Sequence, residues 1–325
     1  MFRASIENQP GPRQVAQWAT SLYGILPMVK RALLSWFGTS TFRFEYGGLV
    51  VYLDTYMDRV EAAPPVGLSV REIMRADFVV IGHSHFDHLW GADKVALNTG
   101  ATIVGSYETT RLMRESGVAD RQLLSVAGGE PIRLADDVLL RVLPGQHSSI
   151  WARFPHTAAE SCVGDLGVTQ QERLERLLGE MRQPDGQPLG PEIERHLQDS
   201  AQGARGDGGA LAYLIETPEG TLFWSDTSGY WTGVLQGRHA DVAILAASGR
   251  GTIDGEPTQG TLADFIADEA ALLRPRRVIP CHHDNFMPPY TTHHDLEPIR
   301  QVLAKRLPEV SFAELAYSDP FPIFE

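Results

Sequence analysis

Apolar residues along the chain recur with two periods, which together predict strands and helices in alternation. Residues 41–54 alternate apolar and polar positions around Gly47-Gly48 and predict a β-hairpin. Short apolar runs predict further strands at 78–81, 101–105, 130–143, 210–216, 221–226, 241–247 and 277–281. Helical spacing or capping signals predict helices at 69–74, 107–116, 169–181 and 262–273 and a helix ending at 200. This order favours an α/β protein with two packed sheets and helices outside them.

Two segments depart from this rhythm and suggest how the domain is organised. Residues 148–209 combine helical patterns with a turn region at 184–191 and a glycine-rich exit, which predicts a mainly helical insertion that acts as a lid. Residues 1–37 are predicted to form an N-terminal helical segment, and 38–325 the main domain. The apolar part of that segment, 15–37, either packs on the domain or lies on a membrane or over the active site.

Composition and charge narrow the class of partner. The chain has 325 residues and a net charge of −13, which disfavours DNA or RNA as a ligand. Its two cysteines do not make a disulfide framework, so a cytoplasmic location is expected. No apolar run has the length of a membrane span, and the first residues lack a signal-peptide pattern. We therefore expect a small-molecule or lipid-like substrate, with peripheral membrane contact left open.

The chemistry is concentrated in one run, His83-Ser-His85-Phe-Asp87-His88, which follows the apolar stretch 78–82. A turn leaving a buried strand can bring all four side chains together. Imidazole and carboxylate groups suit zinc, with manganese and iron as alternatives. One ion takes three or four ligands, so this run plus ligands from elsewhere predicts two divalent ions.

This run matches the His-x-His-x-Asp-His signature of the metallo-β-lactamase superfamily, whose fold is a four-layer αβ/βα sandwich. Further segments resemble the family's other motifs in the same order: Pro144-Gly-Gln-His147-Ser, Phe223-Trp-Ser-Asp226-Thr227 and Ile279-Pro-Cys-His282. The opening Gly38-Thr39-Ser40-Thr41-Phe42 resembles the branch that contains ascorbate-6-phosphate lactonase and N-acyl-phosphatidylethanolamine phospholipase D. In that branch a histidine often stands where this chain has Thr39.

The resemblance implies a dinuclear hydrolase. By this resemblance, the first ion is held by His83, His85 and His147, the second by Asp87, His88 and His282, and Asp226 bridges them. Two ions so held lie about 3.5–4 Å apart and share a hydroxide that forms near neutral pH. That hydroxide would attack an ester-like bond, in a lactone or a phosphodiester. Asp87 and Asp226 are the expected catalytic carboxylates, and Asp87 could also pass a proton to the leaving group.

Several residues around this set have two interpretations. Asp54 is expected either to orient a ligand histidine or to cap a turn. Spacing alone does not distinguish His282 from His283 as the ligand, and the resemblance favours His282. His283 then becomes a candidate for substrate contact or a solvated neighbour, and Tyr290 a candidate for lining the pocket.

Two other functions compete with hydrolysis on the same fold. Di-iron redox proteins of the superfamily usually replace a histidine of the run by a carboxylate and add a flavin domain, whereas His85 is present here. A non-catalytic binding protein would be expected to have lost ligands, and all seven are retained. A metal-dependent hydrolase is therefore the favoured interpretation.

Overall fold

Two mixed β-sheets pack face to face in a computed structural model that describes residues 30–151, 169–179, 188, 190–200 and 206–325. The first sheet has the order β17-β1-β2-β3-β4-β5-β6 and the second β16-β15-β12-β10-β9-β8-β7. The strands of the first sheet are β1 (Leu33–Trp36), β2 (Phe42–Tyr46), β3 (Leu49–Leu53), β4 (Phe78–Val80), β5 (Thr102–Gly105), β6 (Leu123–Ser125) and β17 (Phe321–Pro322). Those of the second are β7 (Pro131–Ala135), β8 (Val138–Pro144), β9 (Leu211–Thr217), β10 (Gly220–Ser225), β12 (Val242–Ala246), β15 (Arg277–Cys281) and β16 (Ser311–Phe312).

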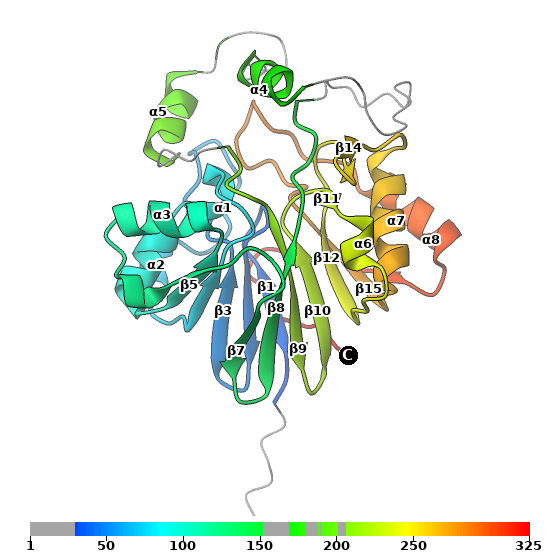
Figure 1. Cartoon of the computed structure of the whole chain (residues 1–325), viewed down its shortest axis with the longest axis horizontal. Coiled ribbons are helices and arrows are strands. Elements are labelled where there is room, and N and C mark those ends of the chain that lie inside the picture. The colour runs from blue at the N-terminus through cyan, green and yellow to red at the C-terminus, as the bar shows by residue number, and fades with distance from the viewer. Residues whose placement is uncertain (1–29, 152–168, 180–187, 189, 201–205) are drawn as a thin grey trace, which may run out of the picture.

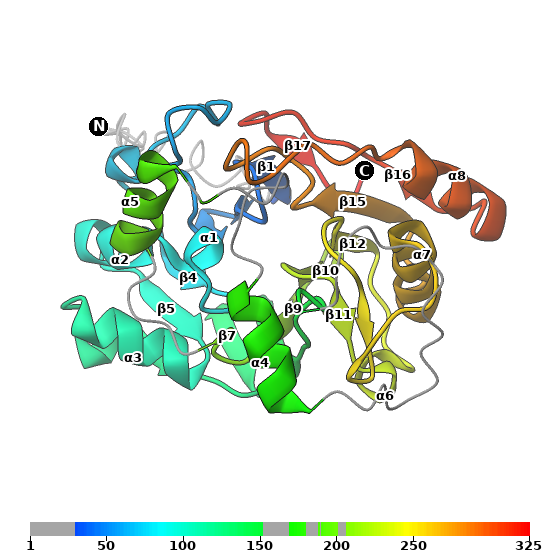
Figure 2. The same cartoon turned by 90° about the horizontal axis from the view of Figure 1, so that it is seen from above.

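Helices cover the outer face of each sheet, as Figures 1 and 2 show. The first sheet is covered by α1 (Phe86–Leu89), α2 (Ala92–Thr99) and α3 (Tyr107–Glu115). The second is covered by α6 (Thr232–Leu235), α7 (Leu262–Leu273) and α8 (Glu297–Arg306). A small sheet of β11 (Gly229–Tyr230), β13 (Thr252–Ile253) and β14 (Glu256–Pro257) lies at one end. This arrangement confirms the predicted four-layer αβ/βα sandwich.

The space between the sheets holds the main apolar core. Phe42 and Phe44 of the first sheet belong to one buried cluster with Tyr213, Trp224 and Ile244 of the second. Strand alternation sends these side chains inward, and burying a Phe or Ile side chain contributes about 1.5–3 kcal/mol. Two further clusters fill the spaces between each sheet and its helices. The strands are thereby held rigidly, so the loops at their ends have fixed starting points.

The predicted hairpin and strands are confirmed, but the N-terminal helical segment is wrong where the structure describes it. Residues Leu33–Trp36 form β1, which pairs antiparallel with β2 and with β17. Leu34 and Trp36 point into the inter-sheet core, and that burial together with two ladders of backbone hydrogen bonds outweighs any local helical preference. Residues 1–29 lie outside the described part of the chain.

The insertion at 148–209 contributes two helices above one end of the sandwich (Figures 1 and 2). They are α4 (Gln170–Gly179) and α5 (Pro191–Ser200), as the helical spacing predicts. The end below them is the one that carries α1. The described residues leave out several parts of this insertion, namely 152–168, 180–187, 189 and 201–205. Phe154, His156, Cys162 and Leu166 fall in the first of these ranges.

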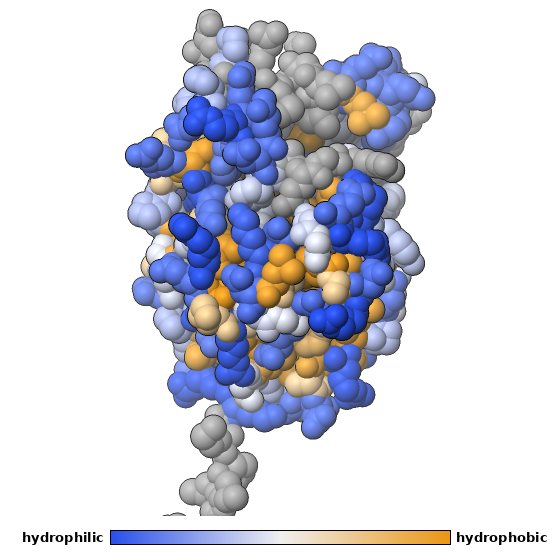
Figure 3. All heavy atoms as spheres, turned by 90° about the vertical axis from the view of Figure 1, so that its left-hand side faces the viewer, coloured by the Kyte–Doolittle hydropathy of each residue, from blue (hydrophilic) through white to orange (hydrophobic). Residues whose placement is uncertain are grey.

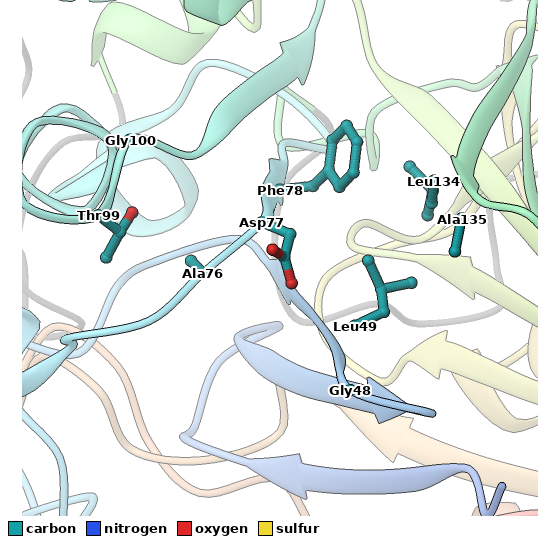
Figure 4. Close-up of a pocket in the computed structure, with 9 residues that line it drawn as sticks. All are labelled: Gly48, Leu49, Ala76, Asp77, Phe78, Thr99, Gly100, Leu134 and Ala135. Carbon is teal, nitrogen blue, oxygen red and sulfur yellow. The ribbon is translucent and has the colours of Figure 1, made fainter.

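A shallow pocket of about 480 Å³ opens at the start of β4, at the end of this strand that is opposite to α1 (Figure 4). Its lining includes Gly48, Asp77, Phe78 and Leu134. Asp77 is its one ionisable side chain, and this carboxylate accepts a hydrogen bond from the Val50 amide at 2.8 Å. Because that carboxylate has a structural partner, this pocket offers no candidate catalytic group.

The surface carries scattered apolar residues. Figure 3 shows separate hydrophobic patches among hydrophilic residues on the side that bears α2 and α3. Exposed large side chains include Met74, Leu97 and Trp231. No helix among the described residues combines the length and apolar character that crossing a bilayer requires.

Glu269 of α7 makes the stability of the folded state depend on pH. Its side chain is buried, and its Oε1 has no hydrogen-bond partner in the described structure. Burial raises the pKa of this carboxyl from its ordinary 4.5 to about 8. The folded state therefore binds the proton more tightly than the unfolded state, and stability must fall as pH rises between these two values.

We expect Glu269→Gln to remove most of this pH dependence and to raise the free energy of unfolding at pH 9 by a few kcal/mol (about 1.4 per pKa unit as an upper bound). Denaturant unfolding of both proteins at pH 5 and pH 9 measures the effect. The exposed Glu309→Gln serves as a matched control. Parallel pH profiles for wild type and Glu269→Gln would contradict the assignment.

Candidate metal centre

Loops that leave the ends of four buried strands bring the candidate ligands together. The strand and residue pairs are β4 with His83, β8 with His147, β10 with Asp226 and β15 with His282. The second half of the histidine-rich run is a short helical turn, α1, which begins after His85 and carries Asp87 and His88. The sequence predicts a turn here, and the helical turn is what points these last two side chains back toward the strand end.

The first group consists of His83, His85 and His147. His83 Nε2 and His85 Nδ1 are 3.0 Å apart, and the His147 ring centroid lies 4.7 Å from that of His83 and 4.6 Å from that of His85. Burial, reinforced by the other imidazoles, holds the pKa of His85 well below its usual range and lowers that of His147 to about 4. The rings of His85 and His147 are therefore neutral at pH 7, and their lone pairs are available to a cation.

The second group consists of Asp87, His88 and His282. Asp87 Oδ2 lies 3.2 Å from His282 Nε2 and 3.6 Å from His88 Nε2. Burial alone would raise the pKa of Asp87, but His88 and His282 outweigh it and hold the carboxyl pKa well below its usual range. Asp87 is thus an anion facing two imidazoles, which is a donor set suited to a divalent cation.

Asp226 lies between the two groups and is fully buried. Its Oδ2 is 2.6 Å from His83 Nδ1 and 3.2 Å from His88 Nδ1. Its Oδ1 has no hydrogen-bond partner in the described structure. Burial raises the carboxyl pKa, but His83 and His88 outweigh it, so the net shift is downward and Asp226 is ionised. A Cβ at Gly82 would overlap this carboxylate, so Asp226 can occupy its place only because residue 82 is glycine.

Asp54 holds His88 from the side away from Asp87. Its Oδ2 lies 2.7 Å from His88 Nδ1, accepts a hydrogen bond from Ser40 Oγ at 2.6 Å, and its Oδ1 accepts one from the Gly82 amide at 3.0 Å. Burial raises the pKa of Asp54 to about 6. Since Nδ1 of His88 faces this carboxylate, Nε2 is left to face the second group. This contact is the one through which the orienting role expected for Asp54 would act.

The carboxylates around His88 make this part of the site attractive to a cation. Burial lowers the pKa of His88, but Asp87, Asp54 and Asp226 outweigh it and raise the pKa well above its usual range. A buried carboxylate oxygen without a partner, such as Asp226 Oδ1, is costly. Divalent cations would supply the missing positive charge and a partner for this oxygen, so these residues fit a metal centre.

The structure separates the two neighbouring histidines. His282 belongs to the second group, whereas His283 is buried, stacks on Trp36 with ring centroids 4.7 Å apart, and lies outside both groups. Tyr290 is half-buried and packs against a small apolar cluster next to the site. Cys281 faces the inter-sheet core, as strand alternation predicts.

Residues that the sequence analysis did not single out line the side of the second group. Tyr56 Oη is 2.7 Å from His196 Nε2 of α5. The Tyr56 ring makes T-shaped contacts with Phe86 and Phe286, with ring centroids 5.7 Å and 6.0 Å apart. Phe86 stands inside the histidine-rich run, and Phe286 lies 5.2 Å from the ring of His282. Their signal in the sequence is only that aromatic residues lie close to ligand motifs.

The family model described as "Beta-lactamase superfamily domain" matches residues 50–171 of the chain, which include the histidine-rich run and His147. A structural comparison supports the same fold. A novel metallo hydrolase from the archaeon Ignicoccus hospitalis, Igni18, superimposes with a TM-score of 0.58 at 17% identity, covering 89% of this chain and 97% of that one.

Curated relatives of the chain are described as metal-dependent hydrolases. A UPF0173 metal-dependent hydrolase of Pyrobaculum islandicum is 25% identical over 256 residues, covering 78% of this chain and 84% of the relative. A second, from Aeropyrum pernix, is 32% identical over 171 residues, covering 47% of this chain and 68% of the relative. The chain therefore belongs to the metallo-β-lactamase superfamily, among its metal-dependent hydrolases.

Proposed function

We propose that the protein hydrolyses an ester-like bond, in a lactone or a phosphodiester, with two divalent ions, of which zinc is the favoured metal. His83, His85 and His147 would hold one ion and Asp87, His88 and His282 the other. The observation that carries this proposal is the presence of two three-residue donor groups side by side, with the buried carboxylate of Asp226 between them. The Oδ1 atom of Asp226, which lacks a hydrogen-bond partner in the described structure, would serve as a further donor.

The bound ions would polarise the substrate oxygen and lower the pKa of water so that a nucleophile forms near neutral pH. The protein's own groups prepare for this. Asp54 and Asp226 face Nδ1 of His88 and His83, which orients each ring so that its Nε2 faces the other donors of its group. Asp87 is nearly buried, with 11% of its side chain exposed, and its carboxylate could take up a proton and give it to the leaving oxygen.

The aromatic residues beside the second group support a substrate with an apolar part. Phe86 and Tyr290 are half-buried there, and α5 packs against α1 with His196 bonded to Tyr56. On the other side of the site, the Arg173 guanidinium of α4 lies 4.4 Å from the Trp151 ring and 3.3 Å from Glu256. We propose that α4 and α5, the described helices of the insertion 148–209, form a lid beside the metal centre that excludes water.

Hydrolysis accounts for the site better than its two competitors. All seven donors are present, which gives no reason to infer a binding protein without catalysis. The relatives named above are metal-dependent hydrolases. A di-iron redox centre would be expected to have a carboxylate in place of one histidine of the run, and the donor groups of the described residues keep these histidines.

Alanine at His85 or Asp226 should reduce metal-dependent hydrolysis to background, because each change removes a donor from the proposed centre. Elemental analysis and turnover of lactone, phosphodiester and thioester substrates, before and after chelator treatment, measure the effect. Wild-type turnover that survives complete metal removal would contradict the proposal, as would full activity in either variant.

Asp54→Ala should lower metal affinity about 10- to 100-fold, because His88 loses the carboxylate that orients its ring. Competition with a chromophoric chelator measures this affinity. The exposed Asp136→Ala, in the turn between β7 and β8, is the matched control and should leave it unchanged. Equal affinities for Asp54→Ala and wild type would show that Asp54 only caps its turn.

A further inference from the structure

The backbone that presents His282 has an unusual conformation. His282 has φ 59° and its amide donates a hydrogen bond of 2.7 Å to the carbonyl of Thr39, which itself has φ 48°. Left-handed backbone is unfavourable for residues other than glycine, and especially for β-branched threonine. Two such residues bonded to each other persist only if surrounding groups hold them in place.

A buried ion pair lies beside Thr39 and can stabilise this left-handed backbone. Arg59 Nη1 lies 2.7 Å from Asp284 Oδ2, and each side chain is 4% exposed. Both partners also bind Thr39: its amide donates to Asp284 Oδ1 at 2.9 Å, and its hydroxyl accepts from Arg59 Nη2 at 3.0 Å. The ion pair therefore binds both the amide and the hydroxyl of Thr39. The carbonyl of this same residue accepts the hydrogen bond from the His282 amide.

Further contacts define the place of each charge. The Arg59 guanidinium lies 5.9 Å from the Tyr56 ring centroid and 5.8 Å from that of Tyr317. The Tyr317 hydroxyl donates to Asp284 Oδ2 at 2.8 Å. A buried ion pair contributes little net stability compared with apolar packing, so stability alone does not explain why charges stand here.

We infer that the Arg59–Asp284 ion pair is a positioning element for His282, and so for the second cation. This inference rests on the proposed function. Asp284 follows His282 by two residues, and Thr39 links both of them to the loop after β1. The histidines of the first group leave other strands, β4 and β8, and make none of these contacts in the described structure. Loss of the pair should therefore weaken the second ion selectively.

The test uses the double variant Arg59→Met/Asp284→Asn, which removes both charges together and leaves no unpaired buried ion. Stoichiometry and the two stepwise affinities for Zn²⁺ are measured by chelator competition, with His282→Ala as reference. Thermal unfolding of the metal-free proteins checks that each is folded. Tyr317→Phe is the matched control, since it removes a hydrogen bond to Asp284 but keeps the ion pair.

We expect the folded double variant to bind the first ion as wild type does and the second about 10- to 100-fold more weakly, and His282→Ala to weaken the second ion at least as much. Tyr317→Phe should retain both affinities. A wild type with two ions and a folded double variant with the same second affinity would overturn the inference and leave the proposed function intact. A wild type that binds fewer than two ions would overturn the two-ion centre and this inference with it.

Discussion

The buried carboxylate of Asp226 lies against two imidazoles, and the rest of the site is arranged around that contact. An ionised group can stay in the interior only when positive charge or hydrogen-bond donors surround it. His83 and His88 supply part of this, and Asp226 Oδ1 is left without a partner in the described structure. The buried, incompletely partnered carboxylate of Asp226 therefore favours the binding of a cation at this site.

The sandwich can supply ligands for such a cation because four strands from its two sheets end at the same end of the molecule. Apolar packing between the sheets holds those strand ends, and the loops leaving them carry the donors with little freedom. The strain at Asp54, Thr39 and His282, all with positive φ, lies in this same shell. Stability supplied by the core therefore supports unfavourable backbone at the places where function requires it.

A second layer of contacts orients the donors. Ser40 reaches Asp54, Asp54 reaches His88, and the Arg59–Asp284 pair holds Thr39, whose carbonyl receives the His282 amide. These partners come from segments far apart in the chain. Because their side chains have no regular spacing relative to the ligands, their pairing had no pattern in the sequence from which it could be read.

Much of the fold was predictable, because strand alternation and apolar runs depend on local spacing. The hairpin at β2 and β3, the strand before His83 and the helix α7 were all predicted within one or two residues. Residues 33–36 were wrongly assigned to a helix, since the pairing that makes them a strand comes from β2 and from the distant β17. Local pattern cannot reveal a partner nearly three hundred residues away.

By itself the sequence indicated the superfamily, the two-sheet architecture and the candidate donors of residues 83–88, because dense spacing of His and Asp after a buried strand survives as a linear motif. The tertiary structure decided that His282 lies in one donor group with Asp87 and His88, whereas His283 packs on Trp36. It also decided that Asp226 faces two imidazoles and that Arg59 meets Asp284. These are matters of distance between loops, and distance is created only when the sheets pack.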